Sequence, residues 1–159
     1  MDEILMLLEK DARMTAKQIA AVLGRDEAEI REAIAKYETD GTILKYSTFV
    51  NHDNLEEENV TALIEVKISP QKGDGYDRIA KRIYQYDEVE SLYLMTGTYD
   101  LLVTMTARTM KDAAQFVYAR LATIEGVTST ATHFIMKKYK EKNCIFEREP
   151  EQEERLFFV

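Results

Sequence analysis

Residues 89–107 constrain the fold of this chain more than any other stretch, because two strongly apolar arms flank a short turn. The turn holds Gly97, Thr98, Tyr99 and Asp100. Gly97 can adopt a positive φ and Asp100 can accept a hydrogen bond from a nearby backbone N–H, which predicts a β-hairpin. Both faces of this hairpin are apolar, so both need cover. Helices of the same chain can cover one face, and the pattern predicts self-association through the other, with the turn at the seam.

The composition limits the class of protein. A chain of 159 residues, 45% hydrophobic and 31% charged, is long enough for one domain or two small ones. No apolar run approaches the roughly 20 residues of a membrane span, and acidic residues follow Met1 where a signal segment would be basic and apolar. The single cysteine, Cys144, cannot form an internal disulfide or a metal cluster. We therefore expect a cytoplasmic protein without a membrane partner.

Residues 1–50 are typical of a small helical domain followed by β-rich arms. Apolar residues recur at helical spacing over 2–11, Thr15 and Gln18 form a capping-box pattern, and Asp26 caps a third helix. Residues 42–50 predict a β-wing. The spacing of Ala20, Gly24 and Ile30 is a helix-turn-helix signature: a small residue where two helices cross, a turn glycine, and an apolar residue that packs the second helix back. The alternative is a helical domain with no role in DNA binding.

The third helix opens with acidic residues, which is unusual for a helix that enters a DNA groove. Residues 1–58 hold seven Lys and Arg against fourteen Asp and Glu, a difference of −7 within a net charge of −8. Phosphate contacts must then come from a few basic residues, while an acidic side chain can read cytosine. Each acid taken alone is as well explained by a solvated face. The candidate DNA contacts are Arg13, Lys17, Arg25, Glu29, Arg31, Lys36 and Lys45.

The remainder of the chain predicts a polar hinge and a second domain. Residues 51–59 form the hinge, and strand and helix patterns over 60–142 follow the order β-α-β-β-α-β. This order predicts an α+β, ferredoxin-like domain: one antiparallel four-stranded sheet, with the two hairpin arms as its middle strands, and two helices on one face. The other face is expected to be open and apolar, so that two copies would bury it. In the second helix, Ala114, Phe116, Val117 and Leu121 are expected to be buried.

Residues 143–159 form a C-terminal tail. Residues 144–146 predict a further short strand, residues 147–154 are acidic, and the apolar residues 156–159 are expected to dock on the chain's own core or on a neighbouring subunit. His52 is expected in a turn and His133 in a strand, partly buried. The residues indicate no catalytic pair, no metal site and no cofactor, and hence not an enzyme.

Together these features resemble the Lrp/AsnC (leucine-responsive, feast/famine) transcriptional regulators over roughly residues 1–140. The most specific pieces are residues 11–15, 38–43, 97–103 and 124–127. The resemblance implies a protein that binds double-stranded DNA, dimerises through the sheet of its C-terminal domain, and assembles further into tetramers or octamers. It also implies an amino-acid effector bound at an intersubunit seam by Gly97, Thr98, Tyr99 and Asp100. The Asp100 carboxylate would then pair with the effector ammonium, and the backbone N–H groups of Gly97 and Thr98 would hold its carboxylate.

Two departures from this family leave alternatives open. Ala33 stands about where the family usually has arginine, and the third helix opens with acids rather than polar or basic residues. One alternative is therefore an amino-acid-sensing or assembly module with weakened or lost DNA binding. Another is a siroheme-decarboxylase-like enzyme, which would want a cluster of Arg and His that this sequence lacks. A third is that Gly97 and Asp100 serve only the turn.

Overall fold

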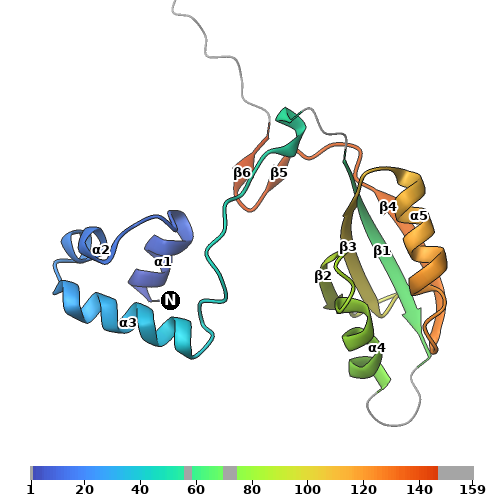
Figure 1. Cartoon of the computed structure of the whole chain (residues 1–159), viewed down its shortest axis with the longest axis horizontal. Helices are drawn as coiled ribbons and strands as arrows, with labels where there is room; N and C mark the ends of the chain where they lie inside the picture. The colour runs from blue at the N-terminus through green and yellow to red at the C-terminus, as the bar shows by residue number, and fades with distance from the viewer. Residues whose placement is uncertain (1, 56–58, 70–74, 147–159) are drawn as a thin grey trace, which may run out of the picture. The chain divides into compact units, whose positions relative to one another are not determined.

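The computed structural model describes residues 2–55, 59–69 and 75–146. The chain forms two compact units, Met1–Val50 and Asn51–Val159 (Figure 1). Within the described residues, no helix is long and apolar enough to cross a membrane.

The first unit contains three helices: α1 (Glu3–Lys10), α2 (Ala16–Leu23) and α3 (Glu27–Thr39). Each begins after a side chain that accepts a hydrogen bond from an otherwise unpaired backbone N–H of the first turn. Asp2 caps α1, Asp26 caps α3, and Thr15 with Gln18 forms the complete capping box of α2. The predicted helix starts are thus confirmed.

The helix-turn-helix is also confirmed, because its three signature residues lie where the pattern requires. Gly24 ends α2 in the left-handed region at φ 65°, which a glycine adopts without steric cost. Ala20 and the fully buried Ile30 lie in one small core, whose buried members are Ile4, Leu8, Ile19, Ala20 and Ile30. Burial of this apolar surface holds α3 against α1 and α2.

The wing expected over residues 42–50 is not formed as paired strands. Residues 44–50 have no regular secondary structure, and Leu44 is 89% exposed. Ile43 N donates a 2.9 Å hydrogen bond to Tyr37 O, and Tyr46 Oη donates one of 2.9 Å to Glu38 Oε1. The segment therefore closes back on the end of α3, because a β-rich sequence becomes a strand only where another strand pairs with it.

The second unit has the predicted ferredoxin-like architecture (Figure 1). Its strands are β1 (Val60–Ile68), β2 (Val89–Leu94), β3 (Leu101–Ala107) and β4 (Val127–Phe134), in the antiparallel order β2-β3-β1-β4. Its helices are α4 (Gly75–Tyr84) and α5 (Met110–Phe116), and α5 continues into a π-helical turn, Val117–Leu121. The expectation that both hairpin arms are middle strands is wrong, since β2 lies at an edge and β1 takes the central place beside β3.

One face of this sheet packs on the two helices and forms the main core. Ile64, Val66 and Val103 are fully buried there, together with Ile83 of α4. In α5 the buried alanine is Ala113, and the expected Ala114 is exposed. Thr109 caps α5 by accepting from Asp112 N, which starts the helix at Met110 and so fixes which positions face the sheet. The expected burial of Phe116, Val117 and Leu121 is confirmed.

The other face of the sheet is only partly apolar. The strand register places Tyr93, Leu102 and Glu65 in one row across β2, β3 and β1. The expectation of a wholly apolar face therefore needs correction. His133 of β4 lies on this face with its Nε2 3.3 Å from Glu65 Oε1, and its side chain is 59% exposed, so it is less buried than expected.

Beyond β4 the chain forms a two-residue hairpin, β5 (Lys140–Glu141) and β6 (Cys144–Ile145). Lys142 and Asn143 both have positive φ, as a type I′ turn requires. The predicted short strand is thereby confirmed for Cys144–Ile145. In the hinge, His52–Asn54 form a 3₁₀ turn, as predicted for His52. The acidic stretch 147–154 and the expected docking of residues 156–159 lie outside the described residues.

Candidate functional site

Turn 97–100 connects β2 to β3 and extends their pairing by one more backbone hydrogen bond. Met95 N donates to Asp100 O at 2.8 Å, and Asp100 N donates to Val66 O of the neighbouring β1 at 3.0 Å. Gly97 has φ 130°, which side-chain-bearing residues rarely adopt, and nothing lies within 4 Å of the position that a Cβ would take. Gly97 and Thr98 are exposed, whereas Tyr99 and Asp100 are half-buried.

The carboxylate of Asp100 links this turn to two other elements. Its Oδ2 accepts a 2.7 Å hydrogen bond from Ile68 N at the end of β1, and its Oδ1 accepts one of 3.3 Å from Tyr76 Oη in the first turn of α4. Burial, the charge of Asp100 and this hydrogen bond raise the pKa of Tyr76. Asp100 therefore fixes the turn, the end of β1 and the start of α4 against one another.

The structure thus brings the four predicted effector residues together in one turn and adds two that the sequence did not indicate. Ile68 and Tyr76 precede Asp100 by 32 and 24 residues. No spacing rule connects residues at such separations, so the sequence alone had no signal for them. The Asp100 carboxylate, which the resemblance assigns to an effector ammonium, already accepts two hydrogen bonds within the chain.

Two arginines at α3 are paired with acidic residues of that helix. Arg25, just before the helix, forms an ion pair with Glu29, and Arg31 forms one with Glu27. The hydrogen bond from Arg25 lowers the pKa of Glu29. Asp26 is occupied as the helix cap. Three of the acids near the start of α3 therefore have a structural role: Asp26 is the helix cap, and Glu27 and Glu29 are i,i+4 partners of arginines. The four-residue spacing of these pairs is visible in the sequence.

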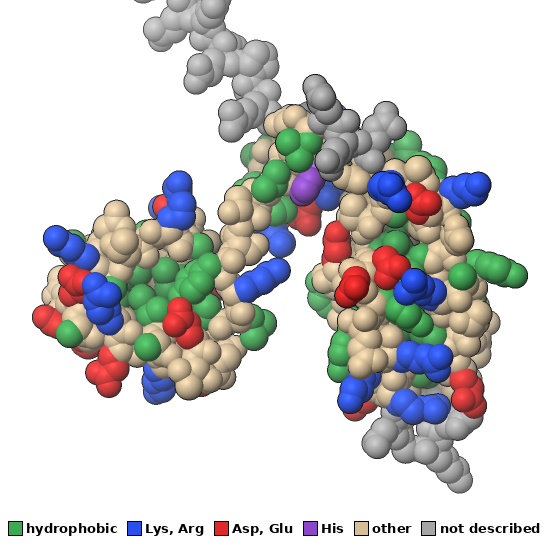
Figure 2. Space-filling view, in the orientation of Figure 1, with side chains coloured by type: hydrophobic (Ala, Val, Ile, Leu, Met, Phe, Trp, Pro, Cys, Tyr) green, Lys and Arg blue, Asp and Glu red, His purple; other side chains and the backbone are tan. Residues whose placement is uncertain are grey.

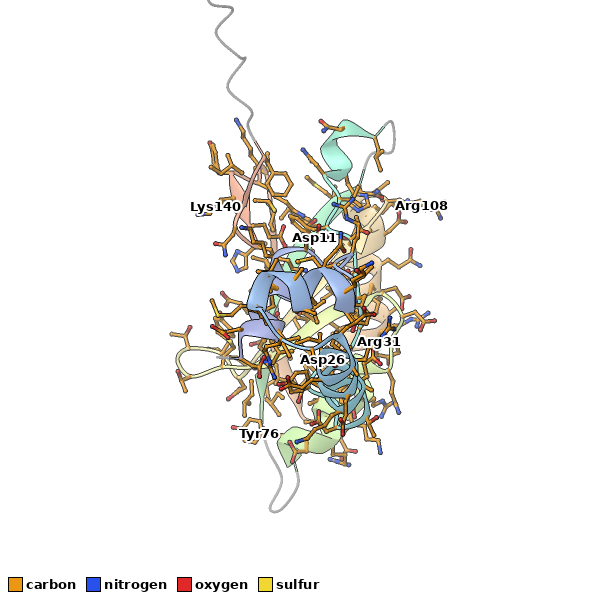
Figure 3. All side chains as sticks on the ribbon, turned by 90° about the vertical axis from the view of Figure 1, so that its left-hand side faces the viewer. Asp11, Asp26, Arg31, Tyr76, Arg108 and Lys140 are labelled. Atoms are coloured by element: carbon orange, nitrogen blue, oxygen red, sulfur yellow. The ribbon has the colours of Figure 1, made fainter. Side chains whose placement is uncertain are left out.

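The other candidate DNA contacts are distributed over several elements. Lys17 on α2, Lys36 on α3 and Lys45 after α3 are exposed. Arg13 is also exposed, with its Nε 3.1 Å from Asp11 Oδ1. Figure 3 labels Asp26, which caps α3, and Arg31, which lies on α3. The structure places all seven candidates in the first unit, and four of them, Arg13, Arg25, Glu29 and Arg31, take part in ion pairs.

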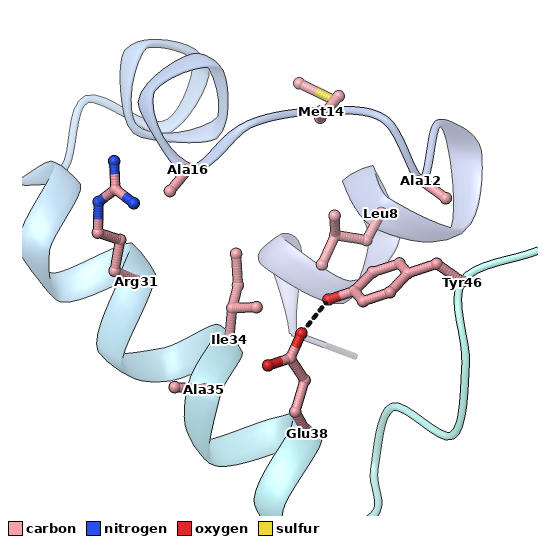
Figure 4. A pocket seen from close by; sticks show the side chains of 9 residues that line it. All are labelled: Leu8, Ala12, Met14, Ala16, Arg31, Ile34, Ala35, Glu38 and Tyr46. Carbon is pink, nitrogen blue, oxygen red and sulfur yellow. Dashed lines mark hydrogen bonds between the residues drawn. The ribbon is translucent and has the colours of Figure 1, made fainter.

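A pocket of roughly 370 Å³ opens on the first unit and was not expected from the sequence. Leu8, Met14 and Ile34 contribute apolar surface, and Figure 4 shows Tyr46 closing one side, with its hydroxyl bonded to Glu38. Arg31 also lines it, so this candidate DNA contact borders the pocket. Figure 2 shows apolar side chains gathered on the visible face of this unit among charged ones. Because the lining comes from several separate segments, no local pattern could have indicated it.

Comparison with known proteins identifies the second unit. Residues 61–145 match the family model described as the Lrp/AsnC ligand binding domain. The chain belongs to the Lrp/AsnC family. Among curated relatives of this family, the uncharacterized HTH-type transcriptional regulator YugG of Bacillus subtilis is 42% identical over 146 residues, which is 91% of this chain and 88% of YugG. The HTH-type transcriptional regulator FL11 of Pyrococcus furiosus is 30% identical over 139 residues, covering 87% of this chain and 89% of FL11.

Solved structures of Lrp/AsnC-type regulators share the fold. Escherichia coli AsnC aligns over 87% of this chain and 91% of its own, with a TM-score of 0.70 and 22% identity. The regulator NMB0573 of Neisseria meningitidis, solved as a complex with L-Met, aligns over 87% and 89% with a TM-score of 0.72 and 22% identity. The family match spans turn 97–100, so this turn lies inside the ligand-binding domain. The chain is accordingly a helix-turn-helix transcriptional regulator by family.

Proposed function

We propose that this Lrp/AsnC-family regulator binds double-stranded DNA through residues 1–50 and senses an amino acid at turn 97–100 of its C-terminal domain. The observation that carries the proposal is the turn itself. Within a ligand-binding domain, it exposes Gly97 and Thr98 beside the half-buried carboxylate of Asp100. The turn therefore offers a carboxylate and exposed backbone within four residues.

An amino acid fits this chemistry because it carries an ammonium and a carboxylate at fixed separation. The Asp100 carboxylate supplies a charged acceptor for the ammonium, and the backbone N–H groups of Gly97 and Thr98 supply donors for the carboxylate. Tyr99 borders the site. The L-Met complex of NMB0573, a structure of the same fold, supports an amino acid as the class of effector.

The proposed regulation works through assembly. The half-apolar open face of the sheet, with Tyr93 and Leu102, is the proposed surface of a homodimer, and dimers would assemble into tetramers or octamers. An effector that binds one assembly more tightly than another shifts their populations and so the spacing of the helix-turn-helix units. In this division residues 51–59 are the hinge, 60–142 the effector and oligomerisation domain, and 143–159 the tail.

A second candidate function is an amino-acid-sensing assembly module with weakened or lost DNA binding. The ion pairs of Arg25 with Glu29 and of Arg31 with Glu27 favour it, since both arginines are paired with acids of the helix that would enter the groove. Retention on DNA from the gene's own upstream region at low salt separates the two functions. Salt-sensitive retention supports the regulator, and undetectable retention at low salt leaves the sensing module.

A thermal-shift screen with the twenty L-amino acids tests the sensing step. A ligand that binds only the native state stabilises it by about 2.7 kcal/mol when present at 100 times its Kd. The matched D-amino acids are the control for nonspecific stabilisation. Asp100→Asn keeps the shape of the side chain and removes its charge, so it should abolish a stereospecific shift. A screen in which no L-amino acid raises the melting temperature more than its D-form contradicts the proposed effector class.

A further inference from the structure

The hydrogen bond between Tyr76 and Asp100 lies at the proposed effector site, but the proposed function gives it no role. Asp100 Oδ2 accepts from the backbone N–H of Ile68, the last residue of β1, at 2.7 Å, which is a short bond. Asp100 Oδ1 accepts from the Tyr76 hydroxyl at 3.3 Å, a long bond from a neutral side chain. The two oxygens of one carboxylate are therefore held with unequal strength.

We propose that Tyr76 competes with the effector ammonium for Asp100 Oδ1, so that effector binding releases the first turn of α4 from turn 97–100. This inference rests on the proposed function, because it concerns the same carboxylate and the same class of effector. It assigns to Tyr76 the role of a positioning residue that holds Asp100 in the effector-free state and sets the effector's affinity.

The chemistry favours displacement at Oδ1 rather than at Oδ2. A hydrogen bond from a charged ammonium to a carboxylate is shorter and about twice as strong as one from a neutral donor. The Ile68 N–H is held in place, because Ile68 is buried and pairs with Val127 of β4. The Tyr76 hydroxyl can leave at small cost, because the side chain is half-exposed and water can replace Asp100 as its partner.

The release would reach the rest of the domain through α4. Tyr76 is the second residue of α4, and its ring packs against the main core. The same helix buries Ile79 and Ile83 in that core. Loss of the hydroxyl bond therefore loosens the first turn of α4 while the remainder of the helix stays packed. The effector site and a helix of the assembly domain are thereby coupled through one hydrogen bond.

The test is Tyr76→Phe in the full-length chain, which removes the competing donor and keeps the ring. Isothermal titration with each amino acid that raises the melting temperature should give a Kd about two- to tenfold lower for Tyr76→Phe than for the unchanged chain, the range expected for one neutral hydrogen bond. Tyr84→Phe is the matched control, since Tyr84 lies on the same helix and is 57% exposed. It should leave the Kd unchanged.

Hydrogen exchange supplies a second readout that a merely structural role would not produce. The amino acid that binds in the titration should speed exchange of the second-turn amides of α4 in the unchanged chain, because these amides donate to the carbonyls of the first turn. In Tyr76→Phe, exchange there should already be fast and should not respond. An unchanged or raised Kd for Tyr76→Phe, beside loss of binding in Asp100→Asn, overturns the competition and leaves the proposed function intact. If no amino acid binds the unchanged chain, the proposed effector class fails and the competition fails with it.

Discussion

Arg25 and Arg31 are each paired with a glutamate of α3. We expect these ion pairs to weaken DNA binding, and removal of the two glutamate charges to strengthen it. The perturbation is the double substitution Glu27→Gln and Glu29→Gln, which keeps the size and helical propensity of both side chains. Glu27 pairs with Arg31 and Glu29 with Arg25, so both guanidinium groups lose their partners. All four side chains are at least one-third exposed, and such pairs contribute little to folding. The variant should therefore stay folded.

The size of the effect follows from the charges of the first unit. Residues 1–50 carry seven basic and ten acidic residues, a net charge of −3, and the double substitution reduces this to −1. Each arginine that gains a phosphate contact adds roughly −0.9 to the slope of log K against log salt, so two add about −1.8 per subunit. Between 200 and 50 mM salt, a slope change of this size corresponds to about tenfold in relative affinity.

The assay is a salt titration of binding to DNA from the gene's own upstream region, with the unchanged chain and the variant side by side. Glu9→Gln with Glu90→Gln is the matched control, because it removes two exposed acids that lie outside α3. The control should raise affinity slightly without steepening the slope. The reasoning is refuted if the α3 variant and the control have the same slope, since Arg25 and Arg31 would then not reach phosphates.

Three further predictions concern the stability of the first unit. Ile30→Ala, at a fully buried site, should lower its free energy of unfolding by about 2–5 kcal/mol in chemical denaturation, and a loss below that range would mean that α3 is not held by this residue. Gly24→Ala should cost about 1–2 kcal/mol from left-handed strain alone, because nothing lies within 4 Å of its Cβ position; no loss would contradict the turn geometry. The hydrogen bond from Tyr37 lowers the pKa of Asp2 below its ordinary value of 3.8. The ionised carboxylate therefore stabilises the folded state above pH 3.8, and this stabilisation is lost as the pH falls through the lower pKa of the folded state. Tyr37→Phe should therefore reduce the difference in unfolding midpoint between pH 7 and pH 3, and an unaltered difference would exclude this contact as a source of acid sensitivity.

Local signals in the sequence predicted much of the fold. The capping box of Thr15, the left-handed Gly24 and the buried Ile30 each depend on residues within a few positions of one another, so their spacing was sufficient. The alternation of apolar residues along β1 and the order of strands and helices likewise predicted the ferredoxin-like domain. The prediction of a wing was wrong for the opposite reason: a strand forms only by pairing with another strand, and residues 44–50 have no regular secondary structure.

Less of the candidate sites could be predicted from the sequence. Turn 97–100 was predicted as a unit, but the partners of Asp100 lie in β1 and α4, and only the folded sheet brings them together. The pairing of Arg25 with Glu29 is different, because a separation of four residues at a helix predicts such an ion pair. Contacts between residues close in the sequence could therefore be predicted. Contacts between distant residues that only the folded sheet brings together could not.

The central position of β1 in the sheet has a consequence for the synthesis of the protein on the ribosome. β1 is synthesised first among the four strands, yet it pairs with β3 on one side and with β4 on the other. At about 5–20 residues per second, roughly 2–8 s pass between the end of β1 and the end of β3, and another 1–5 s before β4 is complete. Throughout that time an apolar strand has at least one open edge. Nascent chains are therefore most exposed to wrong pairing during translation of α4 to β4, after the helical unit can already have folded.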